Sequence, residues 1–307
     1  MTRHLSMPRL QAYLKDTELP ARSVLWPVEE AQKIIRYGSF VGSLVEHHRT
    51  LDRAMIHARA HIEGCERSNV SVTSGTVILA DRLTGSKGRF TRTWYAPQGG
   101  LWGCMIYIST LLPRYRILVP LAVGIACCEA VREQGAEQAV IRWINDVLID
   151  GRKVGGFLAE NFTGHRSRED YCLLGFGINI NNSRFPDELD QIATSLKNRL
   201  GREVDIEQFT YCFLAKLCWN LGLLYYREQR ELEAGNSDSA DKHPLVARWL
   251  ELSDSVGRPV VFGFDVRENP QYRATVTGIT NDGGLLLKLD DGAEVVEHSG
   301  EIRYVKG

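Results

Sequence analysis

The sequence lacks an excess of charge of either sign, and it lacks a long apolar run. Its 307 residues include 37 Lys and Arg against 38 Asp and Glu. Because the net charge is near zero, no global field draws the chain to nucleic acid or to an anionic membrane, and any basic site has to be local. The longest apolar run, LVPLAVGIACC at 118–128, is far shorter than the roughly 20 residues of a bilayer-spanning helix. The start, MTRHLSMPRLQAYLKD, has no apolar core and so predicts no signal peptide.

The sequence also lacks a paired-cysteine pattern. Its seven cysteines are odd in number, none belongs to a C-x-x-C pair, and most lie in apolar segments. This usage is typical of free, buried thiols in a reducing compartment, and it argues against a disulfide framework or a zinc site. We therefore predict a cytoplasmic protein without a metal site.

The spacing of apolar residues predicts a mixed β-sheet with helices packed on it, an α+β fold. Strands are expected at 75–81, 101–109, 139–143 and 171–180, with two more on either side of a turn at Gly151. Helices are expected at 28–36, 43–62, 115–133 and 206–226. The helix at 43–62 would place on one stripe Leu44, His48, Leu51, Met55, Ala58 and Ile62.

The last quarter of the chain has a different composition. Residues 231–244 are polar and predict a linker, and a short helix is expected from Pro244 to Leu252. Residues 254–307 contain short β runs separated by turn residues, which predict a small all-β barrel or sandwich. We therefore divide the chain into an N-terminal extension (1–42), a catalytic domain (43–230), a linker with a short helix (231–253) and a small β domain (254–307).

Residues 80–100, ADRLTGSKGRFTRTWYAPQGG, form a basic, glycine-bearing loop between two predicted strands. Backbone N–H groups in such a loop can approach a ligand closely, and the cations can neutralise a phosphate. On composition alone, a solvated surface loop is the favoured alternative. The cations are Arg82, Lys87, Arg89 and Arg92.

The segment IRWINDVLIDGRKVGGFLAE at 141–160 carries Arg142, Asp146 and Lys153 on two strands joined by a tight turn. If these strands pair, Asp146 and Lys153 converge, and an acid–base pair beside a phosphate loop suits activation of a carboxylate with ATP. Spacing alone leaves a structural ion pair as the more probable alternative. Further along, GFGINI at 175–180 offers glycines for close approach to a ligand and Asn179 for a purine edge.

These segments, taken in order, resemble the biotin–protein ligases of the biotin/lipoate ligase superfamily. The order is a basic loop with R-x-W-x-x-P-x-G-G-L, then R-W-I-N-D-V, G-R-K-V-G-G and G-F-G-I-N-I-N, then a small β domain. The resemblance implies a catalytic domain like that of class II aminoacyl-tRNA synthetases, followed by an SH3-like β-barrel. It also implies that biotin and ATP, the latter with Mg²⁺, give biotinyl-5'-AMP. Biotin then passes to a lysine of an apo acceptor, typically the biotin carboxyl carrier domain of a carboxylase.

The resemblance also implies roles for individual residues. Lys153 would contact the biotin carboxylate and the α-phosphate, Asp146 would assist the acceptor lysine, and Asn179 would meet the adenine. Arg89 would belong to the loop that closes over the adenylate, and Glu301 would lie where the C-terminal domain approaches the nucleotide. The remaining predicted ligand-binding residues are Lys87, Gly88, Arg92, Trp94, Arg142, Asn145, Thr50 and Gly155.

The sequence departs from the family pattern at several positions. The loop G-R-G-R-x-G-R appears as 86–92, SKGRFTR, with two glycines lost, and Leu83 stands where a glutamine usually precedes it. The family's S-T-N appears as Arg49-Thr50-Leu51, so that only Thr50 is kept from the residues near the ureido ring. A ligase for lipoate or another acyl acid is therefore one alternative, although the R-R-x-x-G-G-G-x-V-x-H-D pattern of lipoate ligases is absent. A non-catalytic ligand-binding homologue is the other.

Residues 1–42 are short for the winged helix that many bacterial relatives carry, and they have no basic helix-turn-helix pattern. We therefore expect no binding to DNA. The resemblance leaves a monomer and a homodimer open.

Overall fold

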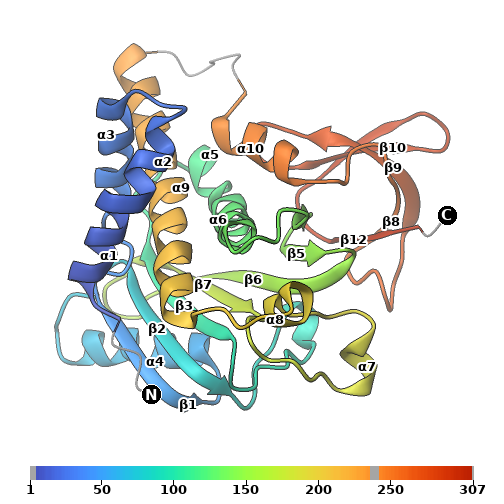
Figure 1. The fold of residues 1–307 in the computed structure, drawn as a ribbon. Coiled ribbons are helices and arrows are strands. Elements are labelled where there is room, and N and C mark those ends of the chain that lie inside the picture. The colour runs from blue at the N-terminus through green and yellow to red at the C-terminus, as the bar shows by residue number, and fades with distance from the viewer. Residues whose placement is uncertain (1–4, 236–241, 306–307) are drawn as a thin grey trace.

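A large mixed sheet with helices on both faces lies beside a smaller antiparallel sheet (Figure 1). The computed structural model describes residues 5–235 and 242–305. The predicted α+β class is confirmed. The large sheet has seven strands in the order β1-β2-β3-β7-β6-β5-β4, and only β1 and β2 pair in parallel. Their bounds are β1 Val45–Leu51, β2 Thr76–Leu83, β3 Leu101–Ile108, β4 Val140–Arg142, β5 Asp146–Ile149, β6 Arg152–Thr163 and β7 Asp170–Ile178.

One face of this sheet carries the main core, under α6 (Val119–Glu133) and α9 (Ile206–Ala234). Helix α6 is buried on most sides, as its apolar run predicted. Helix α9 is also buried all round over 209–224, where the sequence pattern predicted one apolar face. Helix α9 begins at Asp205, whose carboxylate accepts from the backbone N–H groups of residues 207 and 208, and it ends at Gly235 with φ +64°. The opposite face is covered at one end by α4 (Ala54–Arg67), which leaves the other end of that face open for a cavity.

Residues 5–42 contain more helix than predicted. We expected one short helix at 28–36, but the structure has α1 (Met7–Tyr13), a π-helical turn (Leu14–Glu18), α2 (Leu19–Ser23) and α3 (Val28–Gly38). Helix α3 lies side by side with α9 in Figure 1. The two backbones approach so closely that a Cβ at Gly222 would lie 2.1 Å from the carbonyl oxygen of Ile34. Sequence pattern missed these helices because their burial depends on α9, about 200 residues away in the chain.

The predicted helix at 43–62 is wrong in its first half. Residues 45–51 form the edge strand β1, hydrogen-bonded in parallel to β2, and the helix begins only at Ala54. The segment V-E-H-H-R-T-L has few apolar residues because an edge strand at the rim of the sheet is half-buried. Ala58 and Ile62 are buried on one face of α4, as predicted. The error came from extending this apolar stripe to residues before Ala54, where α4 begins.

The C-terminal residues form a five-stranded antiparallel sheet of order β11-β10-β9-β8-β12. The strands are β8 Pro259–Gly263, β9 Tyr272–Ile279, β10 Leu285–Leu289, β11 Glu294–Glu297 and β12 Glu301–Tyr304. The predicted short helix is confirmed as α10 (Pro244–Leu252). Of the predicted linker, 231–234 belong to α9, and 236–241 lie outside the described residues. The short helices that remain are α5 Pro113–Arg116, α7 Asp187–Asp190, α8 Leu196–Leu200 and a 3₁₀ turn at Arg89–Thr91.

Two sequence expectations concern the whole chain. The seven cysteines are free thiols, and six of them are buried, as predicted. Burial raises the pKa of Cys128 to about 12, so this thiol stays protonated near neutral pH. Within 5–235 and 242–305, no helix has the length and apolar character needed to cross a bilayer.

Candidate active site

A cavity of about 770 Å³ lies on the α4 side of the large sheet, between the strands, the basic loop and the C-terminal sheet. Its walls combine segments from the first turn of α4 to β12, so distant parts of the chain meet there. Eleven of the thirteen predicted site residues line it, namely Lys87, Gly88, Arg89, Arg92, Trp94, Arg142, Asn145, Asp146, Lys153, Asn179 and Glu301.

The floor of the cavity is formed where β6 and β7 pair through Gly156 and Gly177. These glycines leave room that a protein side chain occupies, because a Cβ at Gly177 would lie 2.7 Å from Nε1 of Trp94 and one at Gly156 would lie 3.3 Å from the same ring. Gly175 is covered in the same way by Met55. The glycines therefore bring Trp94 and Met55 close to the sheet, whereas we expected them to admit a ligand directly.

Asp146, Arg142 and Lys153 converge as the hairpin predicted. Asp146 begins β5, where it pairs across the sheet with Arg142 of β4, and Lys153 lies at the start of β6. The carboxylate of Asp146 contacts the guanidinium of Arg142 and the ammonium of Lys153. Nζ of Lys153 also lies 5.1 Å from the ring centroid of Trp94. Burial favours the neutral carboxyl of Asp146, but Lys153 and Arg142 outweigh it and hold its pKa well below the usual range.

The basic loop is held in a defined shape. Gly88 N–H donates to the carbonyl of Arg92 at 2.8 Å, and Trp94 N–H donates to the carbonyl of Ser86 at 3.0 Å. Between them Phe90 has φ +54°, and its exposed ring contacts the guanidinium groups of both Arg89 and Arg92. The loop is thus a closed turn with its own hydrogen bonds, despite the loss of two glycines.

The two arginines of this loop attach it to the C-terminal sheet. Nη1 of Arg89 donates to the carbonyl of Gly300 at 2.6 Å. Arg92 pairs with both oxygens of Glu301 at 2.9 and 3.0 Å, and it contacts Asp265 in the turn between β8 and β9. Burial lowers the pKa of Arg89, although Glu301 and Asp146 partly offset that effect. Glu301 therefore fastens the loop over the cavity.

The side chains of two asparagines form hydrogen bonds that shape the walls of the cavity. Asn179 is 3% exposed, and its Oδ1 accepts from Nδ2 of Asn182 at 2.9 Å. Nδ2 of Asn145 donates to the carbonyl of Phe157 at 3.0 Å and holds the turn between β4 and β5 against β6. Both residues line the cavity, so they define its contour near Lys153.

The structure does not bring Thr50 and Gly155 to the cavity. Thr50 is exposed on the edge strand β1. Gly155 faces the helices, where a Cβ would meet Sγ of Cys127 at 3.0 Å, and alternation along β6 gives the cavity position to Gly156. Leu83, which stands where the family has a glutamine, does line the cavity.

Sequence reasoning missed several cavity residues. Arg53 immediately precedes α4, Arg267 lies in the connection between β8 and β9, and β12 contributes Arg303 and Tyr304. The ring of Tyr304 lies 5.9 Å from the guanidinium carbon of Arg142. No local pattern could indicate the C-terminal residues, because they reach the cavity only through packing of one sheet against the other.

Positive charge dominates the cavity. Its lining includes eight basic side chains and two acidic ones, Asp146 and Glu301, both already paired with cations. Uncompensated cations are costly unless an anionic ligand pairs with them. The cavity therefore fits a ligand that carries phosphate or carboxylate groups.

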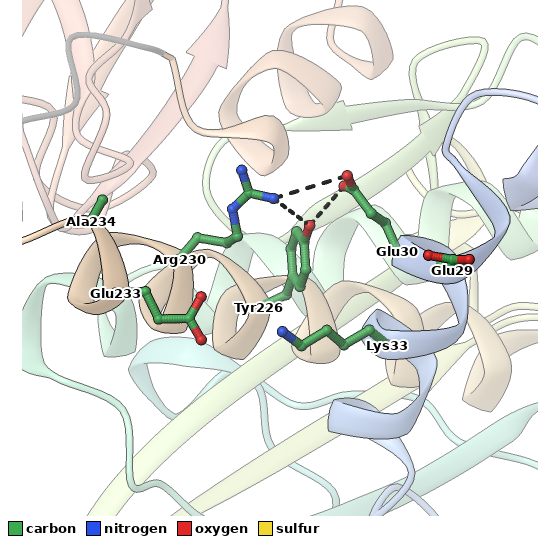
Figure 2. Close-up of a pocket in the computed structure, with 7 residues that line it drawn as sticks. All are labelled: Glu29, Glu30, Lys33, Tyr226, Arg230, Glu233 and Ala234. Atoms are coloured by element: carbon green, nitrogen blue, oxygen red, sulfur yellow. Dashed lines mark hydrogen bonds and ion pairs between the residues drawn. The ribbon is translucent and has the colours of Figure 1, made fainter.

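A second pocket, of about 510 Å³, lies on the surface between α3 and α9 (Figure 2). Figure 2 shows the hydroxyl of Tyr226 between the side chains of Glu30 and Arg230. The hydroxyl donates to Glu30 at 2.7 Å and accepts from Arg230 at 3.0 Å. Tyr226, Glu30 and Arg230 satisfy one another, and the pocket lacks the excess of basic side chains found in the larger cavity, so we assign the active site to the larger cavity.

The class of protein is defined by two features: a seven-stranded mixed sheet followed by a small β domain, and a basic cavity between them. Residues 66–179 match the family model described as the biotin/lipoate A/B protein ligase family, and residues 256–303 match that of the biotin protein ligase C-terminal domain. The bifunctional ligase/repressor BirA of Bacillus subtilis is 30% identical over 239 residues, which cover 75% of this chain and 67% of the relative. The chain belongs to the biotin/lipoate A/B protein ligase family.

Other comparisons agree on the fold. A biotin–[acetyl-CoA-carboxylase] ligase of Paracoccus denitrificans is 26% identical, over 71% of this chain and 86% of the relative. A biotin protein ligase from Aquifex aeolicus, solved with biotin and ATP, superposes with a TM-score of 0.65 at 22% identity, covering 86% of this chain and 99% of that chain. The chain spans 47% and 63% of the length of the BirA relatives from Bacillus spizizenii and Escherichia coli.

Proposed function

We propose that this protein is an ATP-dependent biotin–protein ligase, which forms biotinyl-5'-AMP and transfers biotin to a lysine of an acceptor domain. Membership of the family supports this proposal, as do relatives that are named biotin ligases. The observation that carries it is the placement of Lys153 and Asp146 in a cavity with eight basic side chains. Such a cavity can hold a triphosphate and a carboxylate together.

The first step joins the acid to the nucleotide. A carboxylate oxygen of biotin attacks the α-phosphorus of ATP, the bond to the bridging oxygen breaks, and pyrophosphate leaves. Mg²⁺ would accompany ATP and neutralise part of the phosphate charge. Two anions repel each other as they approach, so cations placed between them lower the barrier. Lys153 is positioned for this role at the start of β6, and Arg89 and Lys87 project from the loop above.

The second step transfers the acyl group. The amine of the acceptor lysine attacks the carbonyl carbon of the adenylate, AMP leaves, and the amine loses one proton. Asp146 has a depressed pKa, and a carboxylate of low pKa is a weak base. We therefore assign Asp146 to orienting the incoming amine and stabilising the positive charge that develops on it. The proton then passes to water.

We further propose that Asn179 contacts the adenine and that Asn145 and Arg142 shape the phosphate region, since all three line the cavity near Lys153. Residues 43–230 would carry the chemistry, and 254–307 would close the nucleotide side through Glu301. The acceptor would be an apo biotin carboxyl carrier domain, and the cytoplasmic location expected from cysteine usage belongs to the same proposal.

The identity of the acid that is activated is the part of the proposal that has a specific alternative. Leu83 lines the cavity in place of the family's glutamine, and an apolar side chain cannot satisfy the ureido group of biotin. A lipoyl or other acyl chain would instead pack against Leu83. Pyrophosphate exchange measured with each acid in turn distinguishes biotin from these alternatives.

The test is exchange of labelled pyrophosphate into ATP, measured with biotin, lipoate or octanoate and purified protein. We expect biotin to support exchange and subsequent labelling of an apo biotin carboxyl carrier domain. Exchange with lipoate or octanoate alone would move the assignment to another acyl acid. Exchange with none of the three acids would contradict an adenylating function.

A further inference from the structure

We infer that a divalent transition metal ion of the Zn²⁺ class binds between β1 and α4, on Glu46, His48 and His57. Glu46 and His48 are two residues apart on a strand and therefore share one face of β1. His57 lies on α4, which covers that face of the sheet. None of the three lines the active-site cavity, and the inference does not depend on the ligase proposal.

The candidate ligand atoms are already gathered. Oε2 of Glu46 lies 3.6 Å from Nε2 of His48 and 3.5 Å from Nε2 of His57, and the three atoms lie within 4.8 Å of one another. Zinc bonds to imidazole nitrogen and carboxylate oxygen are about 2.0–2.2 Å long, which separates two ligands of a tetrahedral ion by about 3.3–3.6 Å. Both distances to Glu46 match the edge of such a tetrahedron.

His48 supports a ligand role in a second way. Its Nε2 is buried and has no hydrogen-bond partner among the described residues. A buried nitrogen that faces a carboxylate without a hydrogen bond is energetically unfavourable. A metal ion coordinated by both groups would remove this cost. The rings of His48 and His57 lie 4.5 Å apart between centroids, so both imidazoles converge on the same point.

His61 contacts the second oxygen of the Glu46 carboxylate. It follows His57 by one helical turn on the same face of α4, and its Nδ1 lies 3.0 Å from Oε1 of Glu46, the oxygen that the other histidines do not share. Groups that hold a metal-binding side chain in place are typical of metal sites. We assign His61 to orienting the carboxylate.

The donor set selects the class of ion. Two imidazoles and one carboxylate suit Zn²⁺ and its transition-metal neighbours, whereas Mg²⁺ and Ca²⁺ prefer oxygen ligands. Three protein ligands leave a fourth position for water. The bound ion would tie the edge strand β1 to α4, whose first turn lines the active-site cavity through Ala54 and Met55.

The test uses untagged, chelator-treated protein and measures Zn²⁺ binding by equilibrium dialysis in excess Mg²⁺. We expect one Zn²⁺ per chain, and we expect H48A and H57A to lose most of the affinity. H61A should lose less, about 10–100-fold, because it removes an orienting group and not a ligand. H165A, which removes an exposed histidine elsewhere, is the matched control and should bind like the wild type.

A second measurement reports the position of the ion. Co²⁺ in place of Zn²⁺ should give the intense visible bands of tetrahedral nitrogen and oxygen coordination in wild type and H165A, and these should be absent in H57A. Circular dichroism confirms that each variant is folded, which alanine on a helix favours. Failure of the wild type to bind Zn²⁺, or unchanged binding by H48A and H57A, would overturn the inference.

Discussion

Two groups of charged side chains can be compared in this molecule, one beneath the N-terminal helices and one in the cavity. Beneath the helices, Lys216 of α9 pairs with Glu18 at 2.7 Å and with Glu133 of α6 at 2.6 Å. Arg22 joins Glu18 to Glu129 at 2.7 and 2.6 Å, and Arg248 of α10 also pairs with Glu129. Within this group three acids meet three bases, although Arg248 also pairs with the surface residue Glu251. We call the six residues the buried network after its central residues Glu18, Glu129 and Lys216.

The cavity has a different balance, with eight bases to two acids. A balanced set of buried charges needs nothing further, and its purpose is to fix how helices meet. An excess of one sign is unfavourable until a ligand of the opposite sign arrives. The ratio of charges, more than the presence of ion pairs, separates a structural cluster from a binding site in this chain. The following variants test that distinction.

Lys216→Ala should have the largest effect, on stability. Removing this base leaves the fully buried Glu18 with Arg22 as its remaining basic partner, so the loss should reach at most about 3–5 kcal/mol, the cost typical of a broken buried pair. Urea denaturation should show this loss in the free energy of unfolding. Lys15→Ala removes an exposed lysine nearby and should stay within about 0.5 kcal/mol of wild type. Equal stability of the two variants would contradict a structural role for the buried network.

Lys153→Ala should affect activity and not stability. Loss of the cation that faces both anions should slow adenylate formation about 100–1,000-fold. Pyrophosphate exchange measures this rate, and thermal unfolding should change little because Lys153 is partly exposed. Lys288→Ala, on the surface of β10, is the matched control. Full activity of Lys153→Ala would remove this residue from the site.

Asp146→Asn should slow the second step more than the first. The amide keeps the shape but loses the charge that stabilises an attacking amine, and a charged hydrogen bond is worth about 1.5–3 kcal/mol, or roughly ten- to a hundredfold in rate. Single-turnover transfer from preformed adenylate to the acceptor domain isolates this step. Asp187→Asn, on the surface in α7, should leave it unchanged. A loss confined to ATP binding would assign Asp146 to the nucleotide instead.

Acid should weaken the buried network gradually. Burial alone would raise the pKa of Glu129, but Arg22 and Arg248 lower it to about 2 from the ordinary 4.5. Since the folded form prefers the ionised carboxylate, its contribution is complete above pH 4.5 and is lost as the pH falls toward 2. The slope is at most about 1.4 kcal/mol per pH unit. Unfolding free energies between pH 5 and pH 3 should fall less steeply for Glu129→Gln than for wild type; parallel curves would contradict the assignment.

Sequence reasoning succeeded where the determining contacts are local. The strands β2, β3 and β7 are continuous apolar runs, and the hairpin of β5 and β6 brings Asp146 to Lys153 within a few residues. It failed for β1, whose polar residues become a strand only by pairing with β2, about 30 residues later. Arg267 and Arg303 reach the cavity through contacts between sheets, and no local pattern can reveal such contacts.

The glycines show a further limit. A glycine in a strand indicates that another group approaches the strand backbone closely, but it does not show whether that group is a ligand or a protein side chain. At Gly177 the neighbour is Trp94, and at Gly156 it is first Lys153 and then Trp94. At Gly155 it is Cys127 on the opposite face. The family resemblance located the segment correctly, and only the alternation of the strand decided which glycine faces the cavity.

The attachment of Arg92 to Asp265 and Glu301 has a consequence for how this protein can evolve. A change of charge at Arg92 leaves two acids, Asp265 and Glu301, without their shared base, so substitution of Arg92 is tolerated mainly in combination with changes at these acids. Such coupling predicts correlated changes between the loop and the C-terminal sheet among relatives of this chain. A chimaera that exchanged one of these segments without the other would lose the ion pairs where the residues at these positions differ.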